Sequence, residues 1–381
     1  MTTFGIICEF NPFHNGHKRL IDSAFSMGAD RVVCVMSGNA VQRGELAIVD
    51  KYERAKAAVL CGADLVLELP FPWCAASAEY FASAGIELLS HFCDAIIFGS
   101  ECGDVELLSL AARQAAEKGF REELRERLGE GERAADTYFS MLEERCGRKL
   151  SSNDLLGIEY IRAIIESGYT MKAYTVKRDG ADYSKQILTE GENPSATAIR
   201  SAWRQGETAD EYMPKEAAEV FRHAEKSDIE RLSRAVLMYY RLADAEALSL
   251  LAELDGGVAN RIVTTARESA GISELFDGIK TKRYTDAKLR RALLFGLAQV
   301  KTELLRQKPE YTTLLGANEK GRDLLSKIRK NEKIRVVTKP ADAPRDCEHF
   351  RAAQRLEDIF LLSLPEVRSS GSGYRKGAFI K

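Results

Sequence analysis

The feature that most constrains the fold is a regular alternation of short apolar runs and helical patterns over the first hundred residues. The apolar runs are rich in aliphatic side chains, as buried strands are. The segments between them carry apolar residues on one helical face, which is typical of the crossover helices of a parallel sheet. The sequence therefore predicts an α/β fold with a doubly wound, mainly parallel Rossmann-like sheet. Strands are expected at residues 4–9, 31–36, 65–69 and 95–98, and helices at 17–27, 50–60 and 78–89.

The chain is longer than one such sheet requires. Its 381 residues exceed what a single core usually supports, so more than one domain is expected. Residues 105–170 are predicted to be mainly helical, and a further strand and helix are expected at 171–176 and 196–203. Between residues 206 and 300, only amphipathic helices are predicted. We therefore expect an α/β domain over 1–205, a helical domain over 206–300 and a separate C-terminal region over 301–381.

The composition excludes several classes of protein. Hydrophobic residues make up 45% and charged residues 29% of the chain, which excludes a mainly disordered protein. The eight cysteines include no C-x-x-C pair, so neither a zinc ribbon nor a disulfide framework is predicted. No stretch approaches the roughly 18 apolar residues of a membrane helix, and the N-terminus lacks the features of a signal peptide. A cytoplasmic protein without a membrane partner is expected.

The strongest chemical signal is the segment NPFHNGH, which follows the first predicted strand directly. Ligands of open α/β sheets bind beyond the carboxyl ends of the strands, where helix N-termini offer free N–H groups to phosphate. His14 and His17 are spaced to share one face of the helix start, and Gly16 leaves room for a phosphate. Imidazoles placed there could stabilise the charge that develops on the α-phosphate of ATP. The alternatives are two surface histidines or a metal-binding pair.

A second segment, SATAIR at residues 195–200, fits the same chemistry. Ser195 and Thr197 can cap a helix whose N-terminus faces phosphate, and Arg200 can reach the same oxygens. The alternative is an ordinary capped surface helix. Together, the H-x-G-H segment and this S-x-T-x-x-R segment resemble the two phosphate motifs of the nucleotidyltransferase superfamily, which includes the class I aminoacyl-tRNA synthetases.

Several further blocks make the resemblance more specific. In matching order the chain carries MSGNAVQRGELA at 36–47, LVLELP at 65–70, FGSECGD at 98–104, SNDLLGIEYI at 152–161 and VKRDGADY at 176–183. With the two phosphate motifs, these blocks resemble the tRNA(Met) cytidine acetate ligase family over essentially the whole chain. The resemblance implies that ATP and acetate form acetyl-adenylate. The acetyl group would then pass to N4 of the wobble cytidine of elongator tRNA(Met).

The resemblance also implies which residues bind ATP. Gly99 would let the adenosine lie against bare backbone, and Asn153, Arg178 and the adjacent Asp179 would complete the site. From the residues alone, Asn153 could instead cap a helix and Arg178 could be a solvated charge. Cys8 stands where relatives tend to carry a smaller or aliphatic residue. The stretch implied to hold ATP consists of Ile7, Cys8, Glu9, Phe10, Asn11, Pro12, Phe13, His14, Asn15, Gly16, His17, Lys18, Arg19 and Leu20.

The loop after the second predicted strand is polar, charged and flanked by glycine. It lies at the same edge of the predicted sheet as the histidines, so we expect a substrate loop that contacts acetate or cytidine rather than core filling. The residues expected to make these contacts are Ser37, Gly38, Asn39, Gln42 and Arg43.

Basic residues are concentrated toward the C-terminus. Residues 301–381 hold 18 basic and 11 acidic side chains, a net charge of +7 in a chain whose total is −2. Neutralisation of phosphate by lysine and arginine supplies most of the sequence-independent affinity for RNA. Contact with tRNA is therefore expected in this region and in a second basic cluster at residues 282–291. The alternative is a solvated helix face. The residues expected to contact tRNA are Lys282, Arg283, Arg290, Arg291, Lys327, Arg329, Lys330 and Lys333.

Two other functions stay open at this point. One is a small-molecule nucleotidyltransferase of cofactor synthesis, which shares the phosphate motifs but leaves the basic region without a role. The other is a non-catalytic tRNA-binding protein that retains a nucleotide fold. ATP is expected as a substrate, and Mg²⁺ is expected only because ATP chemistry uses it. No cluster of carboxylates in the sequence predicts a metal site of the protein's own.

Overall fold

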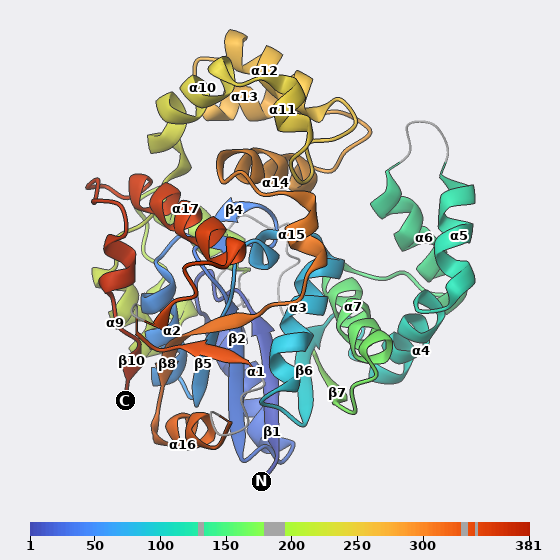
Figure 1. Ribbon diagram of the computed structural model, residues 1–381. Coiled ribbons are helices and arrows are strands. Elements are labelled where there is room, and N and C mark those ends of the chain that lie inside the picture. Colours follow the sequence, from blue (N-terminus) through green and yellow to red (C-terminus); the bar gives the residue numbers. More distant parts are fainter. Residues whose placement is uncertain (129–132, 179–194, 329–333, 340–341) are drawn as a thin grey trace.

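A mainly parallel sheet forms the centre of the molecule in the computed structural model, which describes residues 1–128, 133–178, 195–328, 334–339 and 342–381 (Figure 1). In the described residues the strand order is β10-β8-β5-β2-β1-β6-β7, with β9 paired to β8. The five strands β5, β2, β1, β6 and β7 run parallel to one another. Their bounds are β1 (Thr3–Cys8), β2 (Arg31–Ser37), β5 (Leu65–Leu69), β6 (Ala95–Ser100) and β7 (Lys172–Lys177).

The α/β prediction for the first hundred residues is confirmed because helices cover both faces of this sheet. Along β1, Phe4 and Ile6 pack into one hydrophobic cluster, whereas Ile7 packs into the other, as the two-residue period of a strand requires. The cluster that holds Ile7 lies against α3 and α7, and the cluster of Phe4 and Ile6 lies against α1, α2 and α9. The bounds are α1 (Asn15–Ser26), α2 (Lys51–Leu60), α3 (Ala78–Ser90), α7 (Ser152–Ser167), α8 (Ala196–Arg204) and α9 (Lys215–His223).

Local signals explain where these helices begin. Asp50 caps α2 as predicted, because its side chain accepts a hydrogen bond of 2.9 Å from the main-chain N–H of Tyr52. The first helix starts earlier than predicted, at Asn15, because His14 takes the N-cap position. Between α3 and α7 lie α4 (Val105–Ala115), α5 (Lys118–Arg127) and α6 (Ala134–Cys146), as the prediction of a mainly helical stretch requires.

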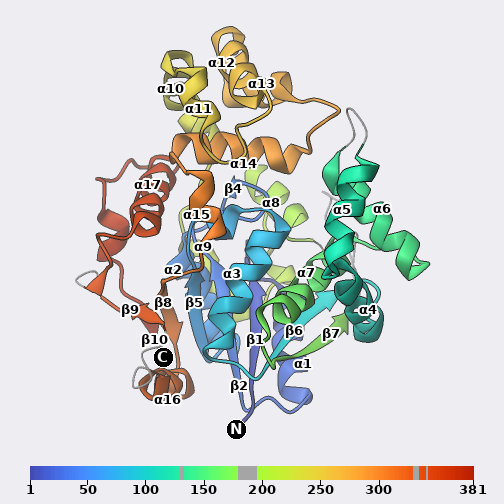
Figure 2. The ribbon, with the colours of Figure 1, turned by 45° about the vertical axis from the view of Figure 1, so that its right-hand side comes forward.

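A second group of helices lies over the carboxyl ends of the parallel strands (Figures 1 and 2). Where the structure describes residues 206–300, it shows helices and no strand, apart from an isolated bridge between Leu251 and Lys301. Within the described residues no helix is long and apolar enough to cross a membrane. The bounds of this group are η3 (Ile229–Leu232), α10 (Ser233–Leu242), α11 (Ala245–Ser249), α12 (Val258–Glu268), α13 (Ile272–Ile279), α14 (Asp286–Leu297) and α15 (Thr302–Arg306).

The C-terminal region contributes to the central sheet, which the sequence does not predict. Strand β8 lies antiparallel to β5, and both β9 and β10 pair with β8 in parallel. Strands β8, β9 and β10 of this region are therefore part of the central sheet. The division of the chain into three domains remains a prediction. The bounds are β8 (Tyr311–Ala317), α16 (Glu319–Ile328), β9 (Arg335–Val337), α17 (Glu348–Leu362), η6 (Ser372–Arg375) and β10 (Phe379–Ile380).

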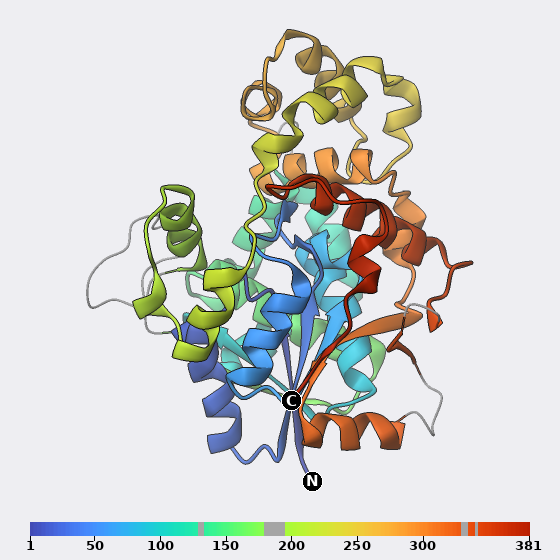
Figure 3. The ribbon, with the colours of Figure 1, turned by 90° about the vertical axis from the view of Figure 1, so that its left-hand side faces the viewer.

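Helix α16 lies at the opposite end of the sheet from the helical group. Lys320 donates a hydrogen bond of 3.2 Å to the carbonyl of Asp30, and Asp323 forms an ion pair with Arg31, the first residue of β2. Figures 1 and 3 place α16 beside the N-terminus, below the sheet. Helix α16, which carries Lys327, therefore lies at the amino ends of the strands and not at the edge where ligands of such sheets bind.

Candidate nucleotide site

The turn after β1 holds both predicted histidines at the start of α1. His14 is the N-cap of α1 and is buried, and its Nδ1 accepts a hydrogen bond of 3.0 Å from the main-chain N–H of Gly16. The Nδ1 atom of His17 accepts one of 3.2 Å from the main-chain N–H of His14. The ring centroids are 3.8 Å apart. This reciprocal capping box fixes both rings at the carboxyl edge of the sheet.

The capping box also determines which ring nitrogen carries a proton. Because Nδ1 accepts a hydrogen bond in both rings, the neutral form of each carries its proton on Nε2. Burial, followed by the guanidinium groups of Arg178 and Arg200, lowers the pKa of His14 to about 3. Burial, followed by His14 and Arg178, lowers the pKa of His17 well below its ordinary value. Both imidazoles are therefore neutral Nε2–H donors near neutral pH.

Buried side chains of the turn itself attach it to the hydrophobic core. Phe10 and Phe13 are fully buried, and their ring centroids are 4.8 Å apart in the hydrophobic cluster of Ile6. Asn11 is also buried, and its side-chain oxygen accepts a hydrogen bond of 2.7 Å from the main-chain N–H of Ile48. In the stretch implied to hold ATP, Phe10 and Phe13 therefore anchor the turn in the core, and His14 and His17 are the side chains available to a ligand.

Helix α8 brings the second predicted phosphate motif to the same turn. Ser195 caps α8 through a hydrogen bond of 3.2 Å from the main-chain N–H of Ala198. Arg200 is buried, and it donates hydrogen bonds to the carbonyl of Asn11 at 2.8 Å and to the hydroxyl of Thr197 at 3.2 Å. The structure therefore joins the two motifs, which are separated by almost 180 residues of sequence.

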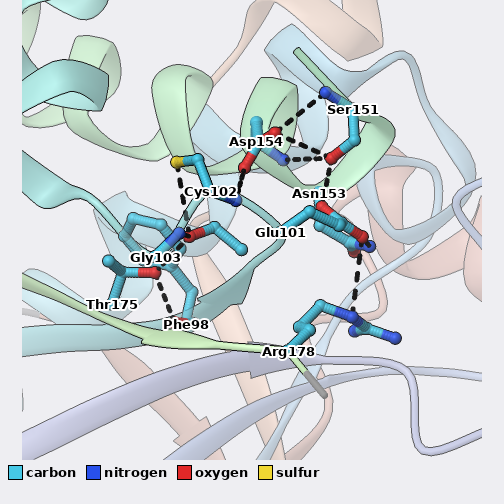
Figure 4. Close-up of polar contacts among 10 residues, drawn as sticks. Phe98, Glu101, Cys102, Gly103, Ser151, Asn153, Asp154, Thr175 and Arg178 are labelled. Atoms are coloured by element: carbon cyan, nitrogen blue, oxygen red, sulfur yellow. Dashed lines mark hydrogen bonds and ion pairs between the residues drawn. The ribbon is translucent and has the colours of Figure 1, made fainter. Parts of the chain in front are cut away.

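A polar cluster beyond the end of β6 surrounds the residues implied to bind adenosine (Figure 4). Asn153 donates a hydrogen bond of 2.5 Å to Glu101, and the Nε atom of Arg178 lies 3.6 Å from the same carboxylate. Ser151, and not Asn153, caps α7. The alternative that Asn153 is a helix cap is therefore wrong, and Arg178 is not a solitary solvated charge.

The backbone of Gly99 lies under the side chain of Arg178. A Cβ atom at Gly99 would be 3.1 Å from the Cγ atom of Arg178, so glycine allows the arginine to cross the end of β6. The space over this glycine therefore holds the stem of Arg178, rather than leaving bare backbone. Asp179, the residue implied to lie next to Arg178, is outside the described residues.

The predicted substrate loop is partly buried. Ser37, Gly38 and Asn39 are buried, although the loop was not expected to fill the core, whereas Gln42 and Arg43 are half-buried. The chain then turns through a small hairpin of β3 (Ala40–Val41) and β4 (Glu45–Leu46). The main-chain N–H of Gln42 donates a hydrogen bond of 2.9 Å to Glu9, whose pKa is raised by burial. The hairpin is thus attached to the end of β1.

A buried network explains why the first half of this loop is inside the protein. The Nζ atom of Lys51 lies 2.8 Å from a carboxylate oxygen of Glu68 and 3.5 Å from one of Glu357 on α17. Asn39 donates a hydrogen bond of 3.1 Å to Glu357 and accepts one of 2.8 Å from the main-chain N–H of Lys51. A buried charge without a partner destabilises the fold, so Lys51 and the carboxylates of Glu68 and Glu357 must remain paired. The loop, the sheet and the C-terminal helix are therefore joined at this edge.

Sequence reasoning missed further residues that organise the site: Glu101 described above, Arg54 and Glu45. Arg54 is fully buried, and its guanidinium donates hydrogen bonds to the carbonyls of Glu9, Gly38 and Val49. Glu45 on β4 accepts a hydrogen bond of 2.7 Å from Arg290 and lies 3.8 Å from Arg200. An arginine within an alanine-rich helix is the only signal that the sequence offers for Arg54, and it indicates no partner.

The residues expected to contact tRNA occupy different parts of the molecule. Lys282 and Arg283 are exposed just before α14 in the helical group, and Arg290 is half-buried against Glu45. Arg291 is buried and pairs with Glu253 at 2.9 Å, so it is occupied within the helical group. Lys327 pairs with Asp323 on α16 at the far end of the sheet. Arg329, Lys330 and Lys333 lie outside the described residues.

Within the residues that the structure describes, no group of three or more histidine, cysteine, aspartate or glutamate side chains could hold a metal ion.

The fold and this pair of phosphate motifs define a nucleotidyltransferase. In agreement, the family model described as HIGH Nucleotidyl Transferase matches residues 1–373. The chain is 35% identical to the tRNA(Met) cytidine acetate ligase of Clostridium perfringens strain SM101, over 91% of this chain and 92% of that protein. It is 36% identical to the enzyme of the same name from Acetivibrio thermocellus, over the full length of both. The chain therefore belongs to the tRNA(Met) cytidine acetate ligase family.

Solved structures agree with this assignment. The crystal structure of Thermotoga maritima TmcAL in its apo form I has a TM-score of 0.90 and 28% identity, and the match covers 100% of this chain and 99% of that one. The same protein bound with alpha-thio ATP has a TM-score of 0.87 at the same identity and coverage. The architecture of the sheet and the helical group is thus shared along the whole chain.

Proposed function

We propose that this protein activates acetate with ATP to form acetyl-adenylate and then transfers the acetyl group to N4 of the wobble cytidine of elongator tRNA(Met). The observation that carries the proposal is the histidine capping box. It holds two neutral imidazoles at a helix N-terminus with Nε2–H as the donor, and Arg200 attaches the second phosphate motif to the same turn. The family membership of the chain supports the choice of substrates.

The first half-reaction follows from this arrangement. A carboxylate oxygen of acetate attacks the α-phosphorus of ATP, a new P–O bond forms, and the bond to pyrophosphate breaks. The Nε2–H groups of His14 and His17 donate to phosphate oxygens on which negative charge develops. The N-terminus of α1 contributes the positive end of its dipole, because its N–H groups at Gly16 and His17 are already bonded to His14. A bound triphosphate raises the pKa of both imidazoles, which strengthens their interaction with the phosphates.

Acetate itself can contribute little binding energy. It has four heavy atoms, so at a ceiling of about −1.5 kcal/mol per atom its Kd is no tighter than tens of micromolar. We therefore expect ATP to bind first and to complete the acetate site. In the second half-reaction, N4 of cytidine attacks the acetyl carbon, the bond to AMP breaks and N4 loses a proton. Because acetyl-adenylate also reacts with water, the RNA must exclude water when it docks.

The proposed activity can be tested directly by product identification. Protein, ATP, radiolabelled acetate and total tRNA are incubated, the RNA is digested, and the labelled nucleoside is identified. We expect label in N4-acetylcytidine from elongator tRNA(Met), together with release of AMP and pyrophosphate. Label transfer without ATP, or pyrophosphate release that needs a phosphorylated acceptor instead of acetate, would refute the proposal.

The role of the histidines needs its own control. His14→Ala and His17→Ala are each expected to abolish acetate-dependent exchange of pyrophosphate into ATP. His223→Ala, at an exposed histidine of α9, is the matched control and should retain full exchange. Full exchange in both His14→Ala and His17→Ala would remove the capping box from the mechanism.

A further inference from the structure

A pocket of about 400 Å³ lies between β4, η3, α13 and α14, on the side of Glu45 that faces the helical group. Its apolar wall is formed by Leu293, Leu294 and Leu297 of α14, together with Ile272 and Phe276 of α13. Its polar rim carries two arginines and four carboxylates, which are Arg204, Arg290, Glu45, Asp228, Glu230 and Asp277. We call this the α13–α14 pocket. Its volume lies in the range of small-ligand sites, and its mixed lining is typical of them.

The pocket is adjacent to the phosphate motifs. Glu45 separates the two, because it pairs with Arg290 at 2.7 Å on the pocket side and lies 3.8 Å from Arg200 on the other. Arg204, one helical turn beyond Arg200 on α8, reaches the pocket. A group bound against Glu45 would thus lie at the boundary of the site in which the adenylate forms.

The hairpin and the helix that border the pocket are in direct backbone contact. Gly44 has a φ of +78°, and a Cβ atom there would lie 2.4 Å from the main-chain nitrogen of Arg291 on α14. Only glycine permits this approach. The position of Glu45 relative to α14 is therefore fixed, and the rim of the pocket is held in place before any ligand binds.

We propose that the α13–α14 pocket receives the target cytosine base, unstacked from its RNA. This inference rests on the proposed function and assigns the acceptor site for its second half-reaction. A flipped base is held by stacking on apolar or planar groups and is read at its hydrogen-bonding edge. The guanidinium carbon of Arg290 lies 4.7 Å from the ring centroid of Phe276, which provides a planar surface beside the leucines of α14.

The chemistry of the rim favours cytosine over uracil. Cytosine presents an exocyclic amine, which donates hydrogen bonds, where uracil presents a carbonyl oxygen. The carboxylate of Glu45 can only accept hydrogen bonds when ionised, so it favours the amine and repels the carbonyl. That amine is the N4 atom that attacks the acetyl carbon. Binding at Glu45 therefore places the nucleophile at the boundary with the phosphate motifs.

Filling the pocket provides the test. Leu297→Trp places a bulky ring in it, and Ser273→Trp does so from the exposed rim on α13, with little risk to folding. Leu242→Trp, at a leucine of α10 that is 81% exposed, is the matched control. Each protein is assayed for acetate-dependent pyrophosphate exchange and for single-turnover acetyl transfer to tRNA(Met).

We expect the pocket variants to transfer acetyl at least about 10-fold more slowly, because the base loses its stacking contact, while exchange stays within about 2-fold. The control should change neither rate. Normal transfer in Ser273→Trp would overturn the pocket assignment even if Leu297→Trp fails to fold. Absence of exchange in the unmodified protein would instead refute the proposed function, so the two failures are distinguishable.

A binding measurement separates the base from other occupants of the pocket. tRNA(Met) lacking the target base should bind the unmodified protein more weakly than intact tRNA(Met) does. Ser273→Trp should bind both RNAs equally, because the base has no pocket to enter. If removal of the base weakens binding to the same extent in both proteins, the pocket holds something other than the base, such as another part of the RNA.

Discussion

Arg200 donates a hydrogen bond of 2.8 Å to the main-chain carbonyl of Asn11, and this contact fixes α8 against the turn that carries both histidines. The same guanidinium group holds Thr197 at 3.2 Å. Arg200 therefore aligns two helix N-termini, those of α1 and α8, on one space. A phosphate between them would meet the positive ends of both helix dipoles.

Replacement of Arg200 by lysine tests this alignment. Lysine keeps the positive charge but lacks the planar fork that reaches both acceptors. We expect Arg200→Lys to lower kcat/KM for ATP by about 10- to 100-fold, the loss typical of a displaced positioning contact. Arg222→Lys, at an exposed arginine of α9, is the control and should leave kcat/KM unchanged. Unchanged kinetics in Arg200→Lys would show that the fork does not align the motifs.

Glu101 is expected to organise the adenosine end of the site. Its carboxylate accepts a hydrogen bond of 2.5 Å from Asn153 and lies 3.6 Å from the Nε atom of Arg178 (Figure 4). Because this pair is partly exposed, its loss is worth no more than about 1 kcal/mol, so Glu101→Gln should raise the KM for ATP about 3- to 5-fold with kcat unchanged. Glu106→Gln, on the exposed first turn of α4, is the control. An equal effect in both variants would contradict the assignment.

The low pKa values of the histidines predict a pH-dependent stability. His14 binds a proton in the unfolded chain near its ordinary pKa of 6.5 but resists protonation in the folded protein down to about 3. The unfolded state thus binds more protons between these values, and stability falls as the pH falls from 6.5 toward 3. The slope from one such group is up to about 1.4 kcal/mol per pH unit.

The variant His14→Asn isolates this contribution, because asparagine can still cap α1. Urea unfolding of both proteins is measured between about pH 7 and pH 5, above the range in which carboxylates dominate. The unmodified protein should lose stability more steeply than His14→Asn does. Parallel curves would show that His14 is not buried as a neutral ring.

Of the basic residues predicted to contact tRNA, those just before α14 are best placed to do so. Lys282 and Arg283 are exposed at the end of the molecule that holds the nucleotide site, whereas Lys327 lies on α16 at the opposite end. Lys282→Ala with Arg283→Ala should weaken tRNA binding and reduce the salt slope by about 1–2, since each phosphate contact contributes about one unit. Lys327→Ala is the control, and an equal loss there would place the RNA on the other end.

The sequence predicts the parallel part of the fold because each element carries its own signal. The apolar run at 65–69 is bounded by turn residues and forms β5 over that range. Asp50, a favoured N-cap residue, marks the start of α2. Strand β8 carries no such signal, since its sequence YTTLLGA lacks a two-residue alternation and its partner β5 is more than 240 residues away. Its place in the sheet depends on a long-range antiparallel pairing.

The candidate site, like the sheet, can be predicted from the sequence only where a local signal exists. The H-x-G-H segment follows a strand, so its position could be inferred locally, but the capping box could not, because histidine is not among the favoured N-cap residues. Glu101, Arg54 and Glu45 act through partners on other elements, and no local pattern identifies them. Their roles depend on contacts that only the folded chain creates.

The central claim is that His14 and His17 bind the phosphates of ATP through Nε2–H. A crystal structure of the protein with a non-hydrolysable ATP analogue tests it most directly. We expect phosphate oxygens within hydrogen-bond distance, about 2.7–3.2 Å, of both Nε2 atoms, with Arg200 still bound to the carbonyl of Asn11. An analogue bound elsewhere, with the space between α1 and α8 empty, would contradict the role of the two histidines.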